Sequence, residues 1–423
     1  MDYLREDYGS YRLHLIKTEK FKLTTVKVSF RREIKKEEIT IRNVLTDMFT
    51  QSSANYNSKK ALTIKAQDLY AADIATATKR IGNYINTDIS LSVLNDKYTE
   101  KGNFKSAVEF LSEIIFKPDV KDGAFNEEKL DIVKNLCKSA LDSVKEDTAA
   151  YSTIRLAEEF DKKSPLSYRM IGYQSDLEKV NTKNLYEYYL SMIKSDLVDI
   201  FVIGNIDFEE IKTIIKNNFK IRTFKKPKGP YLLEDKKARL RKKIAKETID
   251  GTQSKLGIAC RCHGLSDYER NYPMLLFSAI YGGTVDSKLF TDVREKNSLC
   301  YTIWSVPNKL DQTLYIKAGI DKKNYQKSVS LIEKNLQLMK KGDFSDLDIK
   351  KAKEYYNTAL DETLESENSI INEYFMHEVV GTDLLEEKRT KMAKVTKKEI
   401  VTVARKVDMD TIFLLEGVVN EGN

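Results

Sequence analysis

The internal repeat of a whole domain is the feature that most constrains how this chain can fold. In the first half, a helix predicted to start after Asn181 is followed by an apolar strand predicted at 198–204. In the second half, a helix predicted after Thr396 is followed by a strand predicted at 411–415. Asparagine and threonine are both common helix N-caps. The repeat is a little over 210 residues long, so it indicates two related domains, made by duplication and fusion, rather than a solenoid.

A basic segment separates the two halves. Residues 225–246 contain ten lysines and arginines together with Pro227 and Pro230, which interrupt regular structure. The net charge of the whole chain is only +7, so this segment is interpreted as a solvated linker rather than as a nucleic-acid site. We therefore expect an N-terminal domain over 1–224, a linker over 225–246 and a C-terminal domain over 247–423.

Each half mixes predicted strands with predicted amphipathic helices. The stretch 103–116 has apolar residues at 104, 107, 108, 111, 114 and 115, a spacing that favours a helix. The other expected helices are 40–50, 127–144, 148–160, 272–280, 325–339 and 345–364. The expected strands are 24–30, 85–94, 256–259, 302–306 and 314–319. This pattern predicts an α+β fold in both halves.

Cysteine usage and hydropathy exclude two other classes of protein. Four cysteines in a chain of 423 residues are too few for a disulfide framework: Cys137, Cys260, Cys262 and Cys300. The stretch 257–260 indicates a buried strand, which argues against a metal site at the neighbouring cysteines and histidine. The charged N-terminus lacks the apolar core of a secretory signal, and no run approaches the roughly 18–20 apolar residues of a membrane span. We expect a cytoplasmic protein without a membrane partner.

Residues 281–301 carry a long ordered motif. They read Tyr-Gly-Gly-Thr-Val-Asp-Ser-Lys-Leu-Phe and then Thr-Asp-Val-Arg-Glu-Lys-Asn-Ser-Leu-Cys-Tyr. This segment resembles the C-terminal domain of the insulinase/pitrilysin-type inverted-motif zinc peptidases, which include the mitochondrial processing peptidase. That family shows a glycine pair, Ser-x-Leu-Phe, Val-Arg-Glu-Lys and Leu-Ala-Tyr in this order, and only Cys300 departs, where the family has alanine. The resemblance covers nearly the whole chain and implies two homologous domains, each a mostly antiparallel sheet packed with helices, forming half of a clamshell.

The zinc motif of this family is degenerate here. In the family, His-x-x-Glu-His on a helix supplies two ligands and a base for metal-bound water, and a later helix supplies a third, carboxylate ligand. By the resemblance, Asn43 and Asp47 occupy the histidine positions, Thr46 the glutamate position and Asn135 the third-ligand position. An amide oxygen is a poor zinc ligand, and threonine cannot act as a carboxylate base. None of the chain's three histidines is followed four residues later by another. We therefore expect no zinc in this chain and no activity of the chain alone.

The resemblance implies a different role for the second half. There, Arg294 would hold backbone carbonyls of a bound peptide, and Tyr301 would donate a hydrogen bond to the oxyanion that develops on the scissile carbonyl. The alternative is that Arg294 pairs with a surface carboxylate and Tyr301 only packs. Gly282 and Gly283 could let a substrate backbone approach closely, or could simply form the turn between helix and strand.

The resemblance thus implies a non-catalytic subunit of a heterodimeric zinc metallopeptidase involved in peptide processing. The expected partner is a paralogous chain with an intact His-x-x-Glu-His helix, which would hold the zinc, and the expected ligand is a peptide. No nucleic-acid partner is expected. The alternative is a catalytically dead scaffold or peptide-binding protein with no role in proteolysis.

Overall fold

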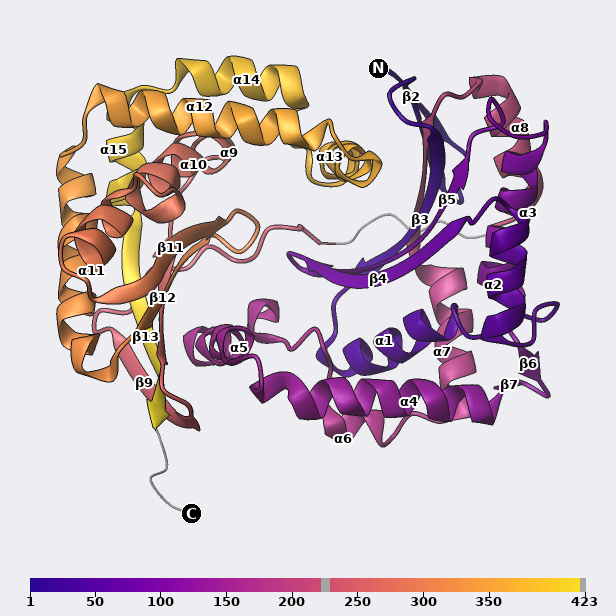
Figure 1. Cartoon of the computed structure of the whole chain (residues 1–423), viewed down its shortest axis with the longest axis horizontal. Helices are drawn as coiled ribbons and strands as arrows, with labels where there is room; N and C mark the ends of the chain where they lie inside the picture. The colour runs from indigo at the N-terminus through magenta and orange to yellow at the C-terminus, as the bar shows by residue number, and fades with distance from the viewer. Residues whose placement is uncertain (222–228, 419–423) are drawn as a thin grey trace. The chain divides into compact units, whose positions relative to one another are not determined.

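The computed structural model describes residues 1–221 and 229–418. The chain divides into two compact units, each with its own sheet and helices (Figure 1). Unit 1 comprises Met1–Ser143 and Arg169–Pro230, and unit 2 comprises Val144–Tyr168 and Tyr231–Asn423. Both units have the α+β architecture that the sequence predicts.

A mixed sheet of six strands forms the centre of unit 1, in the order β1-β2-β8-β3-β5-β4. β2 and β8 are parallel, and the other neighbouring strands are antiparallel. Successive residues of β3 point to opposite faces of the sheet. Val28 and Phe30 belong to the apolar core, and Ser29 and Arg31 belong to the other, polar face. The strands are β1 (Asp2–Asp7), β2 (Arg12–Lys17), β3 (Leu23–Glu33), β4 (Asp73–Ile81), β5 (Tyr84–Leu94) and β8 (Leu197–Gly204).

Helices pack on the apolar face of this sheet. α3 places Phe104, Ala107, Val108 and Leu111 in the core, which is the stripe that its sequence spacing predicts. A short hairpin of β6 (Val120–Lys121) and β7 (Ala124–Phe125) precedes α4. The helices are α1 (Ile39–Met48), α2 (Lys59–Asp68), α3 (Asn103–Phe116), α4 (Glu127–Asp142), α6 (Gln174–Leu177), α7 (Thr182–Ser195) and α8 (Phe208–Asn218).

Unit 2 is built on a mixed sheet of five strands in the order β11-β12-β10-β13-β9. β13 and β9 are parallel, and the remaining neighbours are antiparallel. β11 lies at one edge, where a bulge between Cys300 and Thr302 interrupts its pairing with β12. The strands are β9 (Lys243–Asp250), β10 (Ser254–Cys262), β11 (Cys300–Asn308), β12 (Thr313–Ile320) and β13 (Val407–Val418).

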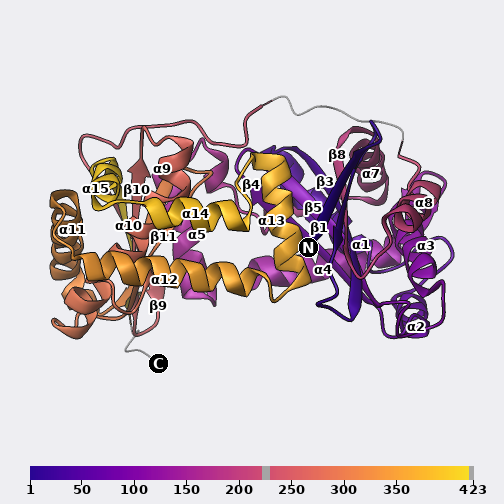
Figure 2. The same ribbon diagram turned by 90° about the horizontal axis from the view of Figure 1, so that it is seen from above.

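Helices and π-helical turns cover one face of this second sheet. α12 and α14 run side by side along unit 2 in both views (Figures 1 and 2). The π-helical turns are η4 (Ala279–Gly283) and η5 (Phe290–Glu295), and both contact β11. The helices are α9 (Asp267–Asn271), α10 (Pro273–Ser278), α11 (Tyr325–Lys341), α12 (Asp346–Thr363), α13 (Glu367–Val380), α14 (Leu385–Lys394) and α15 (Lys397–Arg405).

The helix–strand pairs at the ends of the two halves have the predicted form. Asn181 caps α7 and Thr396 caps α15, each through a capping box in which the side chain of the third helical residue bonds back to the cap. α7 leads into β8, and α15 leads into β13. Each of these strands lies inside its sheet and supplies its parallel pair, so the repeat seen in the sequence is a repeat of structure.

α5 (Thr148–Phe160) belongs to unit 2, although the sequence places it in the first half. It packs against β10 and β13 on the face of the sheet opposite to α10, α11 and α15 (Figure 1). Leu156 and Phe160 form a small second core there with Ala259 of β10 and Phe413 of β13. The division of the chain therefore differs from the expected cut near residue 224, because α5 buries its apolar face on the second sheet.

The expected linker 225–246 is in part a strand. Residues 222–228, which include its start, lie outside the described residues. The stretch 229–242 forms no helix or strand, but Lys243 to Lys246 belong to β9 and pair with β13. The linker thus ends earlier than expected, because the alternating pattern of β9 adds a strand to the sheet. Within the described ranges 1–221 and 229–418, no helix is both long and apolar enough to cross a bilayer.

Candidate functional site

Three of the four degenerate zinc positions lie on α1, and the side chains at two of them, Asn43 and Thr46, make hydrogen bonds within unit 1. The Asn43 side-chain amide donates to the backbone oxygen of Met170 at 2.7 Å. The Thr46 hydroxyl lies 2.8 Å from the backbone oxygen of Arg42 and 2.8 Å from the hydroxyl of Thr78. Thr46 is buried, so its oxygen has no room for a metal ligand shell.

Arg42, which precedes these positions on α1, fixes the helix to the sheet. Its guanidinium is fully buried and donates to Thr87, to the backbone oxygen of Phe30 and to Asp196, at 2.7–2.8 Å. Burial alone would lower the pKa of Arg42, but the charge of Asp196 outweighs it and raises that pKa, so the side chain stays cationic. The face of α1 that would carry a base for zinc-bound water is therefore held by a structural cation.

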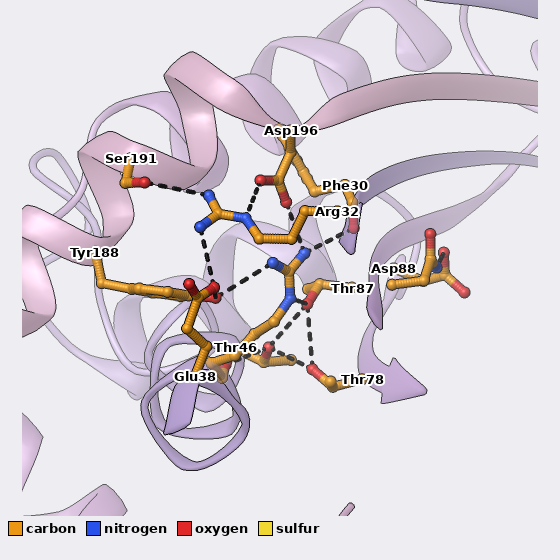
Figure 3. Close-up of polar contacts among 12 residues, drawn as sticks. Phe30, Arg32, Glu38, Thr46, Thr78, Thr87, Asp88, Tyr188, Ser191 and Asp196 are labelled. Carbon is orange, nitrogen blue, oxygen red and sulfur yellow. Dashed lines mark hydrogen bonds and ion pairs between the residues drawn. The ribbon is translucent and has the colours of Figure 1, made fainter. Parts of the chain in front are cut away.

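Asp196 is shared by two arginines. Figure 3 shows its carboxylate beside Arg32, whose Nε donates to it at 2.5 Å. The Arg42 guanidinium donates to the other carboxylate oxygen at 2.8 Å. Arg32 also bonds Glu38 and Ser191 (Figure 3). Sequence reasoning did not single out this network. The available signal was a charged residue, Arg42, between the apolar residues of a predicted core helix.

Asp47 faces α4, where its neighbour is Cys137. The Cys137 thiol lies 3.7 Å from the Asp47 carboxylate. Burial raises the pKa of Asp47, and burial together with the Asp47 charge raises the pKa of Cys137 to about 12. Asn135, the residue at the third-ligand position, is exposed on α4 and makes no hydrogen bond to Asn43, Thr46 or Asp47 among the described residues. The structure thus brings three of the four degenerate positions onto one helix but does not add Asn135 to them.

These donors do not fit zinc. Zinc sites of this kind use imidazole and carboxylate ligands. The helix offers only the Asp47 carboxylate, because the Asn43 amide and the Thr46 hydroxyl are hydrogen-bonded to other groups. Across the part of the chain that the structure describes, no group of three or more His, Cys, Asp or Glu side chains is arranged to hold a metal. No step of a reaction is therefore assigned to a metal bound by this chain.

Gly282 and Gly283 lie in the π-helical turn η4 of unit 2. A β-carbon on Gly282 would come within 2.9 Å of Leu289 and Ser305 side-chain atoms, and one on Gly283 within 3.0 Å of the backbone oxygen of Ser278. Gly282 is buried. Both glycines therefore have a packing reason to lack a side chain: Gly282 lies against β11, and Gly283 lies against the end of α10. Contact of either glycine with a substrate stays a prediction.

Arg294 and Tyr301 flank the turn between η5 and β11. The backbone N–H of Leu299 donates to the Val293 oxygen at 3.0 Å, which closes this turn. Burial raises the pKa of the Cys300 thiol to about 11, and the positive charge of Arg294 acts against that rise. The turn thus joins the two elements that carry the cation and the phenol.

Both side chains are exposed and free of polar partners. The Arg294 guanidinium is 4.5 Å from the centre of the Phe290 ring and makes no ion pair among the described residues. Tyr301 is 59% exposed, and its hydroxyl has no hydrogen-bond partner in the same part of the chain. The β-bulge at Tyr301 turns two consecutive residues outward, Tyr301 and Thr302. The alternative, an ion pair between Arg294 and a surface carboxylate, is not present among the described residues.

The fold and the motif of unit 2 define a peptidase-like protein. A family model described as the peptidase M16 inactive domain matches residues 179–356. The crystal structure of a conserved protein from Enterococcus faecalis V583 has a TM-score of 0.92 and 27% identity, with 100% of both chains covered. Residues 179–356 are thus similar to the inactive domain of the M16, or insulinase-type, peptidase family, and the likeness to the Enterococcus faecalis structure extends over the whole chain.

Two relatives come from Bacillus subtilis (strain 168). The probable inactive metalloprotease YmfF is 27% identical over 420 residues, which cover 98% of this chain and 97% of the relative. The uncharacterized zinc protease YmxG is 25% identical over 312 residues, which cover 71% of each chain. The family resemblance expected from residues 281–301 is thereby confirmed.

Proposed function

We propose that this chain is the non-catalytic subunit of a heterodimeric zinc metallopeptidase. Its partner would be a paralogous chain with an intact His-x-x-Glu-His helix, and the two chains would enclose a peptide between them. The observation that carries this proposal is the contrast between the units. The described residues of unit 1 have no donor set for zinc, whereas unit 2 presents a guanidinium and a phenol, Arg294 and Tyr301, that make no ion pair or hydrogen bond within the described chain.

The chemistry of these two side chains suits a peptide during hydrolysis. A guanidinium offers several N–H donors in a fixed plane, which can hold peptide carbonyls, and a phenol can donate one hydrogen bond to a developing oxyanion. The turn between η5 and β11 fixes the backbone at both residues through the Leu299–Val293 hydrogen bond, and the exposed side chains would become ordered when substrate binds. Gly282 and Gly283 would contribute indirectly, by letting η4 pack closely enough to support β11.

The two Bacillus subtilis relatives support a division of labour. One is named a probable inactive metalloprotease and the other a zinc protease, so one bacterium has a relative of each kind. This chain would take the first role. The zinc would be held by the partner, and this chain would bind peptide without a cofactor of its own.

The test is peptide cleavage by the purified chain, by its His-x-x-Glu-His partner and by a mixture of both. Only the mixture should cleave. The double variant Arg294→Ala/Tyr301→Phe should still form the complex on size-exclusion chromatography but lose at least about 100-fold in kcat/KM, the usual cost of removing oxyanion donors. Tyr301→Phe alone should lower kcat more than it raises KM, because the phenol acts on the transition state.

Two matched variants control for general effects of substitution. Arg241→Ala removes an exposed arginine, and Tyr355→Phe removes an exposed phenol of α12; neither should change cleavage. Normal cleavage by the Arg294/Tyr301 double variant, in an intact complex, would contradict the proposal and favour a scaffold. Cleavage by this chain alone, or stoichiometric zinc in it, would contradict the proposal as well.

A further inference from the structure

A pocket of about 280 Å³ lies within unit 2, between the first turns of α5 and the sheet. α5 contributes small side chains to its wall, among them Ala149 and Thr153. The sheet contributes residues of three strands: Lys255 of β10, Trp304 of β11, and Lys317 and Gly319 of β12. The volume is at the small end for ligand sites and suits one or two side chains rather than a large cofactor.

The strand register explains the shape of this pocket. Trp304 pairs with Lys317, and Lys317 pairs in turn with Gly257. In the adjacent row, Gly319 lies between Thr302 and Lys255. Residues directly opposite one another on neighbouring strands share a face of the sheet. Each row contains a glycine, Gly257 or Gly319, which has no side chain to fill the pocket. The side chains of Trp304, Lys317 and Lys255 form its walls.

The pocket contains two lysines, and no carboxylate of the described residues lines it. The Lys317 ammonium lies 5.0 Å from the centre of the Trp304 ring and forms no ion pair among the described residues. Burial lowers the pKa of Lys317. Lys255 donates to the neutral side chain of Gln253. No aspartate or glutamate lines the pocket. The charges of two partly buried lysines are not neutralised by a carboxylate in this pocket, so an anionic ligand could pair with them.

We propose that this pocket binds the carboxylate of a peptide, either an acidic side chain or a free C-terminus, through Lys317 and Lys255. The indole of Trp304 would pack on the methylene groups that carry the carboxylate. The proposal rests on the function proposed above and names a substrate feature for it: Thr302 lines the pocket and directly follows Tyr301, so the pocket and the phenol are carried by neighbouring residues of β11. Peptides with a carboxylate near the cleaved bond would then be preferred.

Trp304 is the only tryptophan of the chain, so its fluorescence reports on this pocket directly. The full-length chain is titrated with three N-acetylated decapeptides that differ only at the carboxylate. The first has a central Glu and an amidated end, the second a Gln and an amidated end, and the third a Gln and a free C-terminus. At least one carboxylate peptide should bind about tenfold or more tightly than the Gln amide, as measured by Trp304 emission and by calorimetry.

Variants test the role of the lysines. Lys317→Gln should abolish the preference for the carboxylate, and Lys317→Arg should retain it. Lys327→Gln, which removes an exposed lysine of α11, should leave it unchanged and controls for net charge. Equal binding of all three peptides, or full preference in Lys317→Gln, overturns the inference. Saturation by inorganic phosphate with no preference among the peptides overturns it too, in favour of a general anion site.

This test can fail independently of the proposed function. The Arg294→Ala/Tyr301→Phe variant should keep the carboxylate preference in the isolated chain, because neither residue lines the pocket. If that preference is absent while the heterodimer cleaves peptide in an Arg294- and Tyr301-dependent manner, only the pocket inference is wrong. If the preference is present but cleavage does not depend on the pair, the heterodimer proposal is wrong and the chain is a peptide binder.

Discussion

Leu156 of α5 lies directly against Gly257 of β10, so closely that a β-carbon on the glycine would come within 2.9 Å of the leucine Cδ2. Leu156 is fully buried, and its Cβ and Cγ would both be 3.6 Å from the added atom. Gly257→Ala should therefore destabilise the protein by about 1–3 kcal/mol through overpacking. Leu156→Ala should cost about 2–5 kcal/mol. Because both changes act on one contact, the double variant should lose less than the sum.

Urea unfolding followed by Trp304 fluorescence measures this cycle, since the indole is in the same unit as α5. Leu347→Ala, at a leucine of α12 that is 60% exposed, is the control and should change stability by less than about 0.5 kcal/mol. Strict additivity of the two core changes would show that α5 does not pack on β10 in solution.

Asp161, at the end of α5, should give unit 2 a pH-dependent stability. Its carboxylate accepts from Arg261 at 2.8 Å and from Lys236 at 2.9 Å. Burial alone would raise the pKa of Asp161, but these two hydrogen bonds outweigh it and lower the pKa below its ordinary value of 3.8. The stabilisation is therefore complete above pH 3.8 and is lost as the pH falls through the lowered folded-state pKa.

Asp161→Asn should accordingly cost about 1–3 kcal/mol at neutral pH. The difference from the wild type should shrink in acid, below pH 3.8, where the carboxylate is protonated first in the unfolded and then in the folded protein. Asp343→Asn, at an exposed aspartate without a side-chain partner in the described chain, is the control and should show no such trend. Chemical unfolding at several pH values measures both, and a pH-independent loss in Asp161→Asn would contradict the assigned ion pair.

Much of this architecture could be read from local sequence signals. The stripe of 103–116 predicted α3, and Asn181 and Thr396 predicted the starts of α7 and α15, because periodicity and capping depend on neighbouring residues only. The division into units could not be read in this way. Whether α5 packs on the first or the second sheet depends on a contact with Gly257, about 100 residues away in sequence, that no local pattern records.

The candidate site was likewise predictable only in part. The motif of residues 281–301 predicts Arg294 and Tyr301 as site residues, since a family pattern fixes positions in the chain, and their contact with a peptide stays a prediction. Cys137 and Arg42 were missed, because their roles come from Asp47 and Asp196, which other elements bring to them. The same limit applies to the pocket at Trp304, whose lysines lie on different strands and meet only through the sheet register.

Restoring the family's base on α1 should damage the fold rather than create a zinc site. Thr46→Glu would bury a carboxylate where a hydroxyl now bonds Thr78 and the Arg42 backbone, at an expected cost of more than about 2 kcal/mol. Thr46→Val keeps the shape, loses only the hydrogen bonds and should cost about 1 kcal/mol. Urea unfolding by circular dichroism and metal analysis measure the outcomes. A Thr46→Glu variant carrying Asn43→His and Asp47→His that is fully stable and holds one zinc per chain would refute this.

The Cys137 thiol should react slowly with alkylating agents, at a rate that depends on Asp47. With a pKa raised to about 12 from an ordinary 9.0, its thiolate is about 1,000-fold scarcer at pH 8 than that of an unperturbed cysteine. Burial is the larger cause and the Asp47 charge adds to it, so Asp47→Asn should speed alkylation by iodoacetamide several-fold. Mass spectrometry of the peptide that contains Cys137 measures the rate. An unchanged rate in Asp47→Asn would mean that the two groups do not interact.

The placement of α5 also bears on how this duplicated gene can be divided. A fragment starting at residue 247 would contain most of the second sheet but would lack α5. Ala259, Phe413 and Leu415, which α5 covers in the full chain, would then be exposed to water. Such a fragment should aggregate and fold poorly. A fragment that also contains residues 144–168 would include α5 and could bury these apolar side chains. The second sheet therefore depends on a helix from the first half of the sequence, and a single cut between the halves would not yield two complete units.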